Sequence, residues 1–182
     1  MKNIFLFAGD LFLIILLISA CTPVNNPTTI PSQATYTDPF TYCAAVKTVD
    51  KPDERYTGEA IPEEVIQGYL QAAGLKNTTE PEDMLKASTF WRCMDGQVMV
   101  CNAGANLPCE AKANSDKTPT HAMSDYCKDN PEVDFIPMAV TGHDTIYDWS
   151  CEQGVAKVGE QISKVDAAGF IANIWYALPA GK

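Results

Sequence analysis

The chain has 182 residues, and 23 acidic against 13 basic side chains give it a formal net charge of −10 at pH 7. Nucleic acid is therefore not an expected partner, because phosphate binding needs clustered basic residues, and the two arginines, Arg55 and Arg92, lie in different segments. The length beyond the N-terminal leader suits one domain.

The N-terminal segment has the features of an export signal. Lys2 gives it a short positive start, an apolar run covers residues 11–18, and two small residues precede Cys21. The apolar run is shorter than the roughly 20 residues that a membrane-spanning helix needs. The sequence Ile18-Ser19-Ala20-Cys21 resembles the lipobox of bacterial lipoprotein precursors.

This resemblance implies that residues 1–20 are a cleaved signal peptide and that Cys21 carries thioether-linked lipid and an acylated amine. Several acyl chains hold a protein on a bilayer far more firmly than one, so the membrane is an expected partner through Cys21. Thr22 stands where Asp often marks retention in the inner membrane, which favours the outer membrane in a host that has one. An ordinary signal peptide followed by a chance cysteine is the alternative.

Residues 21–40 are expected to be the lipidated cysteine and a disordered tether, because the stretch is rich in Pro, Thr and Asn. A single domain is expected over residues 41–182. Its first half is predicted to contain a strand at 41–49, a helix at 62–74, a turn of helix at 81–86 and a hairpin at 89–101.

The hairpin register makes a prediction about the disulfides. With a two-residue turn at Asp95-Gly96, Cys93 faces Val98 and Cys101 faces Phe90. The two cysteines then point to opposite faces of the sheet, so they are not expected to pair with each other.

The second half is predicted to contain a loop at 102–117, a helix from Thr118-Pro119 to Asn130-Pro131, an edge segment at 133–140 and a meander of strands at 144–151, 155–165 and 170–178. The expected fold class is α+β. Two or three helices cover one face of an antiparallel sheet of four to six strands, and disulfides staple the domain.

Once Cys21 is assigned to lipid, an even set of six cysteines remains: Cys43, Cys93, Cys101, Cys109, Cys127 and Cys151. An even set in an exported chain predicts three disulfides, with fifteen possible connectivities. A loop that folds back to a helix suggests Cys109 with Cys127. The spacings lack the close pairs of thiolate metal sites, so no metal or other cofactor is expected.

Two segments share the pattern Trp-x-Cys-x-x-Gly, beginning at Trp91 and at Trp149. Residues two apart in a strand share a face, so each tryptophan lies beside its cysteine. One interpretation is that each tryptophan packs against a disulfide in the core. The other is that Trp91, Trp149 and Tyr147 line an exposed platform for a sugar or an aromatic ligand. An internal duplication is a third possibility.

His121 and His143 are the side chains that titrate near neutral pH when unperturbed. His143 lies beside Asp144 and next to a glycine, so His143, Asp144 and His121 are candidate catalytic residues. A turn in a surface loop explains the same residues equally well. The sequence has neither a Gly-x-Ser-x-Gly elbow nor a His-Glu-x-x-His helix.

Together these features predict a lipid-anchored protein of the cell envelope, held outside the cytoplasmic membrane. The leading hypothesis is a non-enzymatic binding or interaction module whose partner is an envelope protein or a glycan. The alternative is a small envelope hydrolase or metal-assisted enzyme that uses His143 and nearby carboxylates.

Overall fold

The computed structural model describes residues 34–104 and 106–179. The predicted signal peptide, Cys21 and the tether as far as residue 33 lie outside the described residues. The described residues belong to one compact unit. Among their helices, none has the length and apolar character needed to cross a membrane.

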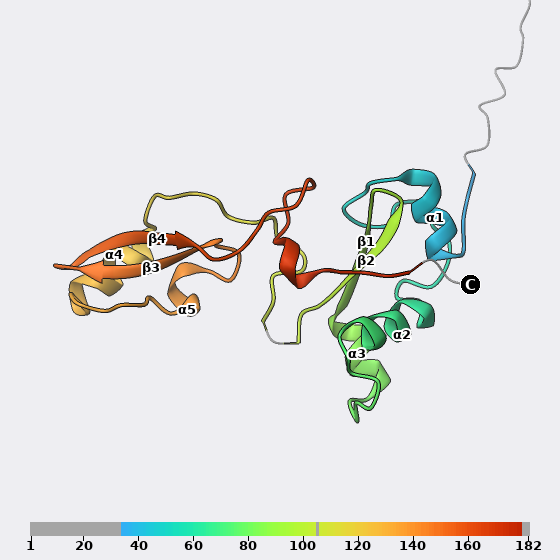
Figure 1. The fold of residues 1–182 in the computed structure, drawn as a ribbon, viewed down its shortest axis with the longest axis horizontal. Helices are drawn as coiled ribbons and strands as arrows, with labels where there is room; N and C mark the ends of the chain where they lie inside the picture. The colour runs from blue at the N-terminus through green and yellow to red at the C-terminus, as the bar shows by residue number, and fades with distance from the viewer. Residues whose placement is uncertain (1–33, 105, 180–182) are drawn as a thin grey trace, which may run out of the picture. The chain divides into compact units, whose positions relative to one another are not determined.

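The fold is α+β, with five helices and two antiparallel sheets in the described part of the chain (Figure 1). The helices are α1 (Pro39–Val46), α2 (Glu63–Ala72), α3 (Glu82–Ser88), α4 (His121–Asp129) and α5 (Met138–Thr141), with a 3₁₀ turn at Ala172–Ile174. The strands are β1 (Thr89–Met94), β2 (Gln97–Asn102), β3 (Tyr147–Glu152), β4 (Val155–Gln161) and β5 (Tyr176–Ala177). One sheet has the order β1-β2-β5 and the other contains β3 and β4, so the expectation of one sheet of four to six strands is wrong.

Helix α1 occupies the segment predicted as the first strand. The Asp38 carboxylate accepts a hydrogen bond from the Thr41 N–H at 2.7 Å, and Pro39 lies in the first turn. Both features favour a helix start, because they satisfy or remove N–H groups that have no partner within the helix. The helix directs Tyr42 and Cys43 into the core.

Order also begins earlier than the predicted boundary at residue 41. The Tyr36 N–H donates to the Arg55 carbonyl at 2.8 Å, and the Thr57 N–H donates to the Tyr36 carbonyl at 2.8 Å. The chain is therefore part of the fold from Tyr36 onward, within the segment assigned to the tether.

The predicted helices at 62–74 and after Thr118-Pro119 are confirmed as α2 and α4. Helix α2 ends before Gly74, whose φ of 72° favours glycine. Helix α4 begins two residues later than the Thr118-Pro119 signal indicates, because the Thr120 hydroxyl accepts a hydrogen bond from the Met123 N–H at 3.2 Å and caps it.

The first hairpin has the predicted register. Its turn residues Asp95 and Gly96 have φ values of 53° and 82°, as a type I′ turn requires. Cys93 faces Val98, and Cys101 faces its predicted partner on β1.

The C-terminal meander is correct in its first two strands and wrong in its third. Strands β3 and β4 form a hairpin, whereas Ala177 of β5 pairs with Met99 of β2 in the other sheet. The physical reason is apolar packing, since Phe170 and Trp175 join Met99 and Cys101 in one buried cluster. The predicted edge segment at 133–140 forms a bridge from Val133 to Cys151 of β3, donates from the Ile136 N–H to the Trp149 carbonyl at 2.7 Å, and then forms helix α5.

Three disulfides join Cys43 to Cys93, Cys101 to Cys109 and Cys127 to Cys151. The suggested Cys109–Cys127 bridge is wrong, because the loop after β2 returns to β2 itself. The prediction that Cys93 and Cys101 do not pair is confirmed. Each disulfide lies in a different hydrophobic cluster, so each crosslinks its own part of the core.

Candidate functional site

The structure does not bring the candidate catalytic residues together. The His143 side chain is exposed, and within the described residues no hydrogen bond or ion pair joins it to another side chain. The His121 side chain is 89 % exposed and lies 3.3 Å from the Asp125 carboxylate. The Asp144 carbonyl accepts a backbone hydrogen bond from the Asn114 N–H. No group of three potential metal ligands gathers in the described part of the chain.

The predicted aromatic platform is not formed. Trp91 and Trp149 are only 4 % and 2 % exposed, and they lie in different hydrophobic clusters. Their indole N–H groups donate to the Ala60 carbonyl and to the Thr145 hydroxyl. Tyr147 is half-buried beside the Trp149 cluster. The interpretation that each tryptophan packs against a disulfide is therefore confirmed.

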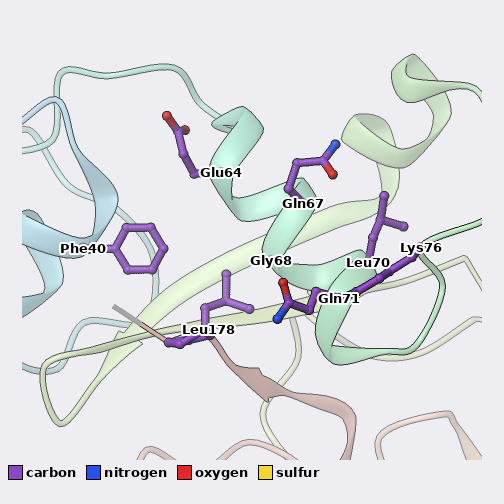
Figure 2. A pocket seen from close by; sticks show the side chains of 9 residues that line it. Phe40, Glu64, Gln67, Gly68, Leu70, Gln71, Lys76 and Leu178 are labelled. Atoms are coloured by element: carbon purple, nitrogen blue, oxygen red, sulfur yellow. The ribbon is translucent and has the colours of Figure 1, made fainter. Parts of the chain in front are cut away.

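A groove beside helix α2, here called the α2 groove, has a volume of about 490 Å³ (Figure 2). Its lining combines apolar side chains with the polar outer face of the helix, and consists of Phe40, Glu64, Gln67, Gly68, Leu70, Gln71, Lys76, Leu178 and Pro179. Three elements far apart in the sequence therefore form it: α1, α2 and the segment after β5.

A close approach of the backbone creates the floor of the α2 groove. A Cβ atom on Gly68 would lie 2.6 Å from Cδ1 of Leu178, so a side chain at this position would force Leu178 to shift from its packing against the helix. The Leu178 N–H also donates to the Val98 carbonyl at 2.8 Å, which holds the segment in register with β2. Leu178 is buried at 2 % exposure.

The polar rim of the α2 groove includes side chains that are not engaged with one another. Within the described residues, Glu64, Gln71 and Lys76 make no hydrogen bond or ion pair with another side chain. Gln67 is engaged within the helix, since its amide donates to the Glu63 carboxylate at 2.6 Å. The rim thus presents one carboxylate, one ammonium group and one amide that can both donate and accept.

A second cavity of about 330 Å³ is lined by aromatic and charged side chains, but the central charge is already engaged. Lys112 donates to the Asp50 carboxylate at 2.6 Å and to the Ala168 carbonyl at 2.5 Å, and its ammonium group lies 3.8 Å from the Phe170 ring centroid. Trp91 lines the same cavity. A ligand there would have to compete with these contacts, so the α2 groove is the better candidate site.

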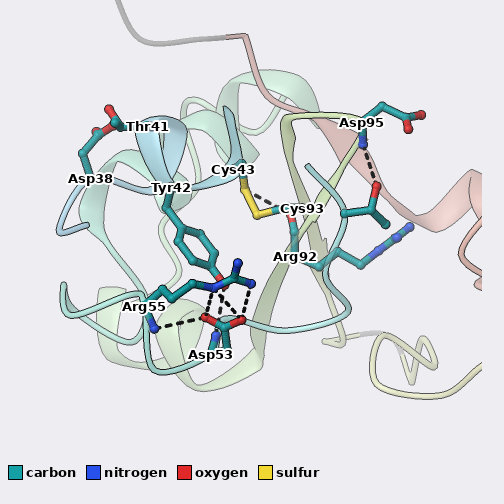
Figure 3. The surroundings of a disulfide bond; sticks show 10 residues. Asp38, Thr41, Tyr42, Cys43, Asp53, Arg55, Arg92, Cys93 and Asp95 are labelled. Carbon is teal, nitrogen blue, oxygen red and sulfur yellow. Dashed lines mark hydrogen bonds and ion pairs between the residues drawn. A yellow bond between two sulfur atoms is a disulfide. The ribbon is translucent and has the colours of Figure 1, made fainter. Parts of the chain in front are cut away.

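An ion pair lies close to the first disulfide (Figure 3). The Arg55 guanidinium donates to the Asp53 carboxylate and lowers its pKa to about 2. The Asp53 N–H donates to the Tyr42 hydroxyl at 3.1 Å, and burial raises the pKa of that hydroxyl. These contacts anchor the loop after α1 to the helix that carries Cys43.

The α2 groove was not among the sites predicted from the sequence. The helix at 62–74 was predicted, and the spacing of Gln67 and Gln71 by one helical turn places them together on its outer face. Phe40 and Leu178 come from segments assigned to the tether and to the last strand of the meander, so their approach to α2 had no local signal.

Comparison of the chain with protein-family models, with curated proteins and with solved structures finds no match in any of the three. The chemistry of the α2 groove therefore carries the functional proposal.

Proposed function

We propose that the chain is a lipid-anchored lipoprotein of the cell envelope and that its domain binds a partner polypeptide without catalysing a reaction. The observation that carries the binding role is the α2 groove, with an apolar floor and a polar rim on which Glu64, Gln71 and Lys76 have no side-chain partner within the described residues.

The lining of the α2 groove suits an extended peptide. Phe40 provides apolar surface for one large side chain above the buried Leu178, while the Gln71 amide can donate to and accept from a peptide backbone. Glu64 and Lys76 add opposite charges that can orient the segment. The volume of about 490 Å³ falls within the range of about 300–1,000 Å³ that is usual for ligand sites.

The location rests on separate support. The Ile18–Cys21 lipobox resemblance implies a lipid anchor, and disulfides persist in oxidising compartments outside the cytoplasmic membrane. The three disulfides suit such a compartment. In a host with an outer membrane, Thr22 favours that membrane.

Site-specific photo-crosslinking in the cells that make the protein tests the binding role. A benzophenone amino acid replaces Gln71 at the rim of the α2 groove, and the matched control places it at Gln97, which is exposed at the start of β2. We expect a discrete adduct with one polypeptide from position 71 and none from position 97. Equal adducts from both positions, or none from position 71, would contradict the proposal.

A further inference from the structure

Two parts of the chain repeat one arrangement of a helix and a hairpin. The first hairpin unit consists of α1, β1 and β2, and the second hairpin unit consists of α4, β3 and β4. In each unit a Tyr-Cys pair lies in the helix, and a Trp-x-Cys-x-x-Gly sequence lies in the hairpin. A disulfide joins the helix cysteine to the strand cysteine in both units.

The hydrogen bonds of the two units agree position by position, counted from the helix cysteine. The backbone carbonyl four residues after the helix cysteine accepts a hydrogen bond from the N–H of the turn glycine, at 2.9 Å in the first unit and 3.0 Å in the second. The side chain five residues after the helix cysteine accepts a hydrogen bond from the N–H of the residue before the turn glycine, at 3.1 Å in the first unit and 3.0 Å in the second. The residue six positions later exchanges two backbone hydrogen bonds with the strand cysteine. These residues are Lys47, Thr48 and Val49 in the first unit and Pro131, Glu132 and Val133 in the second.

The two units differ at the outer edge of the hairpin. In the first unit β5 pairs with β2, and the Leu178 N–H donates to the Val98 carbonyl. In the second unit the described residues supply no third strand beside β4. Val100 of β2 is consequently buried at 0 % exposure, whereas Val158 at the equivalent position of β4 is 37 % exposed.

The open edge of β4 presents backbone groups at alternate residues. Trp149 and Cys151 bond away from β4, to the segment that follows α4. In the β3–β4 ladder, Trp149 with Val158 and Cys151 with Ala156 are therefore the pairs whose two residues exchange no backbone hydrogen bonds. Their partners Val158 and Ala156 accordingly direct their own N–H and C=O groups to the outer edge.

We propose that β4 is the docking edge for an extended segment of a partner protein, which adds as an antiparallel third strand in the way that β5 adds to β2. Strand addition pairs the backbone groups of the edge, and alternate side chains of the incoming segment provide specificity. The inference rests on the repeat of the hairpin unit and is independent of the α2 groove.

The side chains of β4 define the chemistry of the partner. Tyr176 of β5 and Leu178 directly after β5 flank Ala177, and both are apolar residues that share one face of the extended chain. By equivalence, the incoming segment places two apolar residues opposite Ala156 and Val158. The residue between them faces Lys157, where an acidic side chain stabilises the pairing. The expected segment is therefore apolar, acidic, apolar.

A second copy of the chain fits this edge less well. Two copies of β4 related by a two-fold axis would oppose residues that share a face. In the regular part of β4, before its register shift opposite Asp148, the face of Lys157 contains Val155 and Gly159, and neither is acidic. The regular part of a second β4 therefore offers no carboxylate to Lys157, and a different sequence complements this edge better.

Amide hydrogen exchange followed by NMR tests the proposal on the full chain in detergent. The probe is a peptide that copies residues 174–179 with A177D, so that its central residues are Tyr-Asp-Leu. We expect the peptide to slow exchange at Ala156 and Val158 and to leave Val155, which bonds toward β3, unchanged.

A charge exchange then tests the contact with Lys157. Lys157→Glu should weaken binding of the A177D peptide by up to about fivefold, and a peptide with A177K should recover it. Lys164→Glu is the matched control, since it makes the same charge change at an exposed position outside β4.

Three results would overturn the proposal. The first is unchanged exchange at Ala156 and Val158 in millimolar peptide. The second is a peptide affinity that does not change when the charge at residue 157 is reversed, which would indicate apolar contact only. The third is slowed exchange that appears without peptide as the protein concentration rises, which would assign the edge to a second copy of the chain.

Discussion

Arg92 shows how much a single buried charge organises this fold. Its side chain is 0 % exposed and forms an ion pair with Asp166. The guanidinium carbon lies 4.4 Å from the ring centroids of both Phe170 and Trp175. Asp166 in turn accepts hydrogen bonds from the Ala168 and Phe170 N–H groups. Arg92 thus connects β1 to the turn that leads into β5.

Replacing Arg92 should be strongly destabilising. Arg92→Met leaves the Asp166 carboxylate buried without its partner, which we expect to lower the free energy of unfolding by about 3–5 kcal/mol. The double variant Arg92→Met/Asp166→Asn removes both charges and should lose less stability than the single variant. Urea unfolding of the three proteins measures both effects, and a single variant within about 1 kcal/mol of the wild type would contradict this account.

Residue-scale prediction from the sequence succeeded where one residue type has one conformational role. Asp95-Gly96 predicted the turn and the register, because few dipeptides suit two successive residues with positive φ. Local sequence did not assign a role to the histidines, because a histidine beside an aspartate has the same local signature in a turn as in a catalytic pair. A catalytic pair differs from a turn only when further polar groups from other segments lie close to the histidine, and the fold decides which segments lie close.

At the scale of elements, the disulfides contribute unequally. In the chain-entropy account, a crosslink stabilises by restricting the unfolded chain, and the effect grows with the length of the closed loop. The separation between the paired cysteines is 50 residues for Cys43–Cys93 and 8 residues for Cys101–Cys109.

Paired Cys→Ala variants test this ranking. Removal of Cys43–Cys93 should lower the free energy of unfolding by about 4 kcal/mol, and removal of Cys101–Cys109 by about 2.5 kcal/mol. Guanidinium unfolding under non-reducing conditions gives both values. The reverse order would show that native contacts around the short loop outweigh the restriction of the unfolded chain.

Element prediction failed for α1 for a specific reason. Aromatic and sulfur-containing residues at Tyr42 and Cys43 favoured a strand, while the helix signal, Asp38 followed by Pro39, lay in a segment assigned to the tether. Strand β5 failed for a different reason. Its pairing with β2 is set by packing against residues about 75 positions earlier, which local periodicity does not report.

At the scale of the whole molecule, the proposed lipid anchor on Cys21 makes a direct prediction. Cys21→Ser should abolish incorporation of labelled fatty acid and move the protein from the membrane fraction to the soluble fraction. Thr22→Ser, at the neighbouring position, is the matched control and should leave both properties unchanged. Fractionation with fatty-acid labelling measures the outcome, and an unlabelled wild-type protein in the soluble fraction would refute lipidation.

The sequence was sufficient for the α+β class, the number of disulfides and both hairpins, all of which depend on composition or local turn chemistry. It was not sufficient for the division into two sheets or for the α2 groove. Both depend on Leu178 and its neighbours returning to β2 from the far end of the chain. Sequence spacing alone does not specify such a return.

The separation of the core into three disulfide clusters has a practical consequence. Each cluster contains one of the three tryptophans: Trp91, Trp149 and Trp175. Every crosslinked region therefore has an intrinsic fluorophore of its own, placed in the same cluster as its disulfide. Variants that retain a single indole would report separately, by emission and lifetime, on when each region opens as the bridges are reduced.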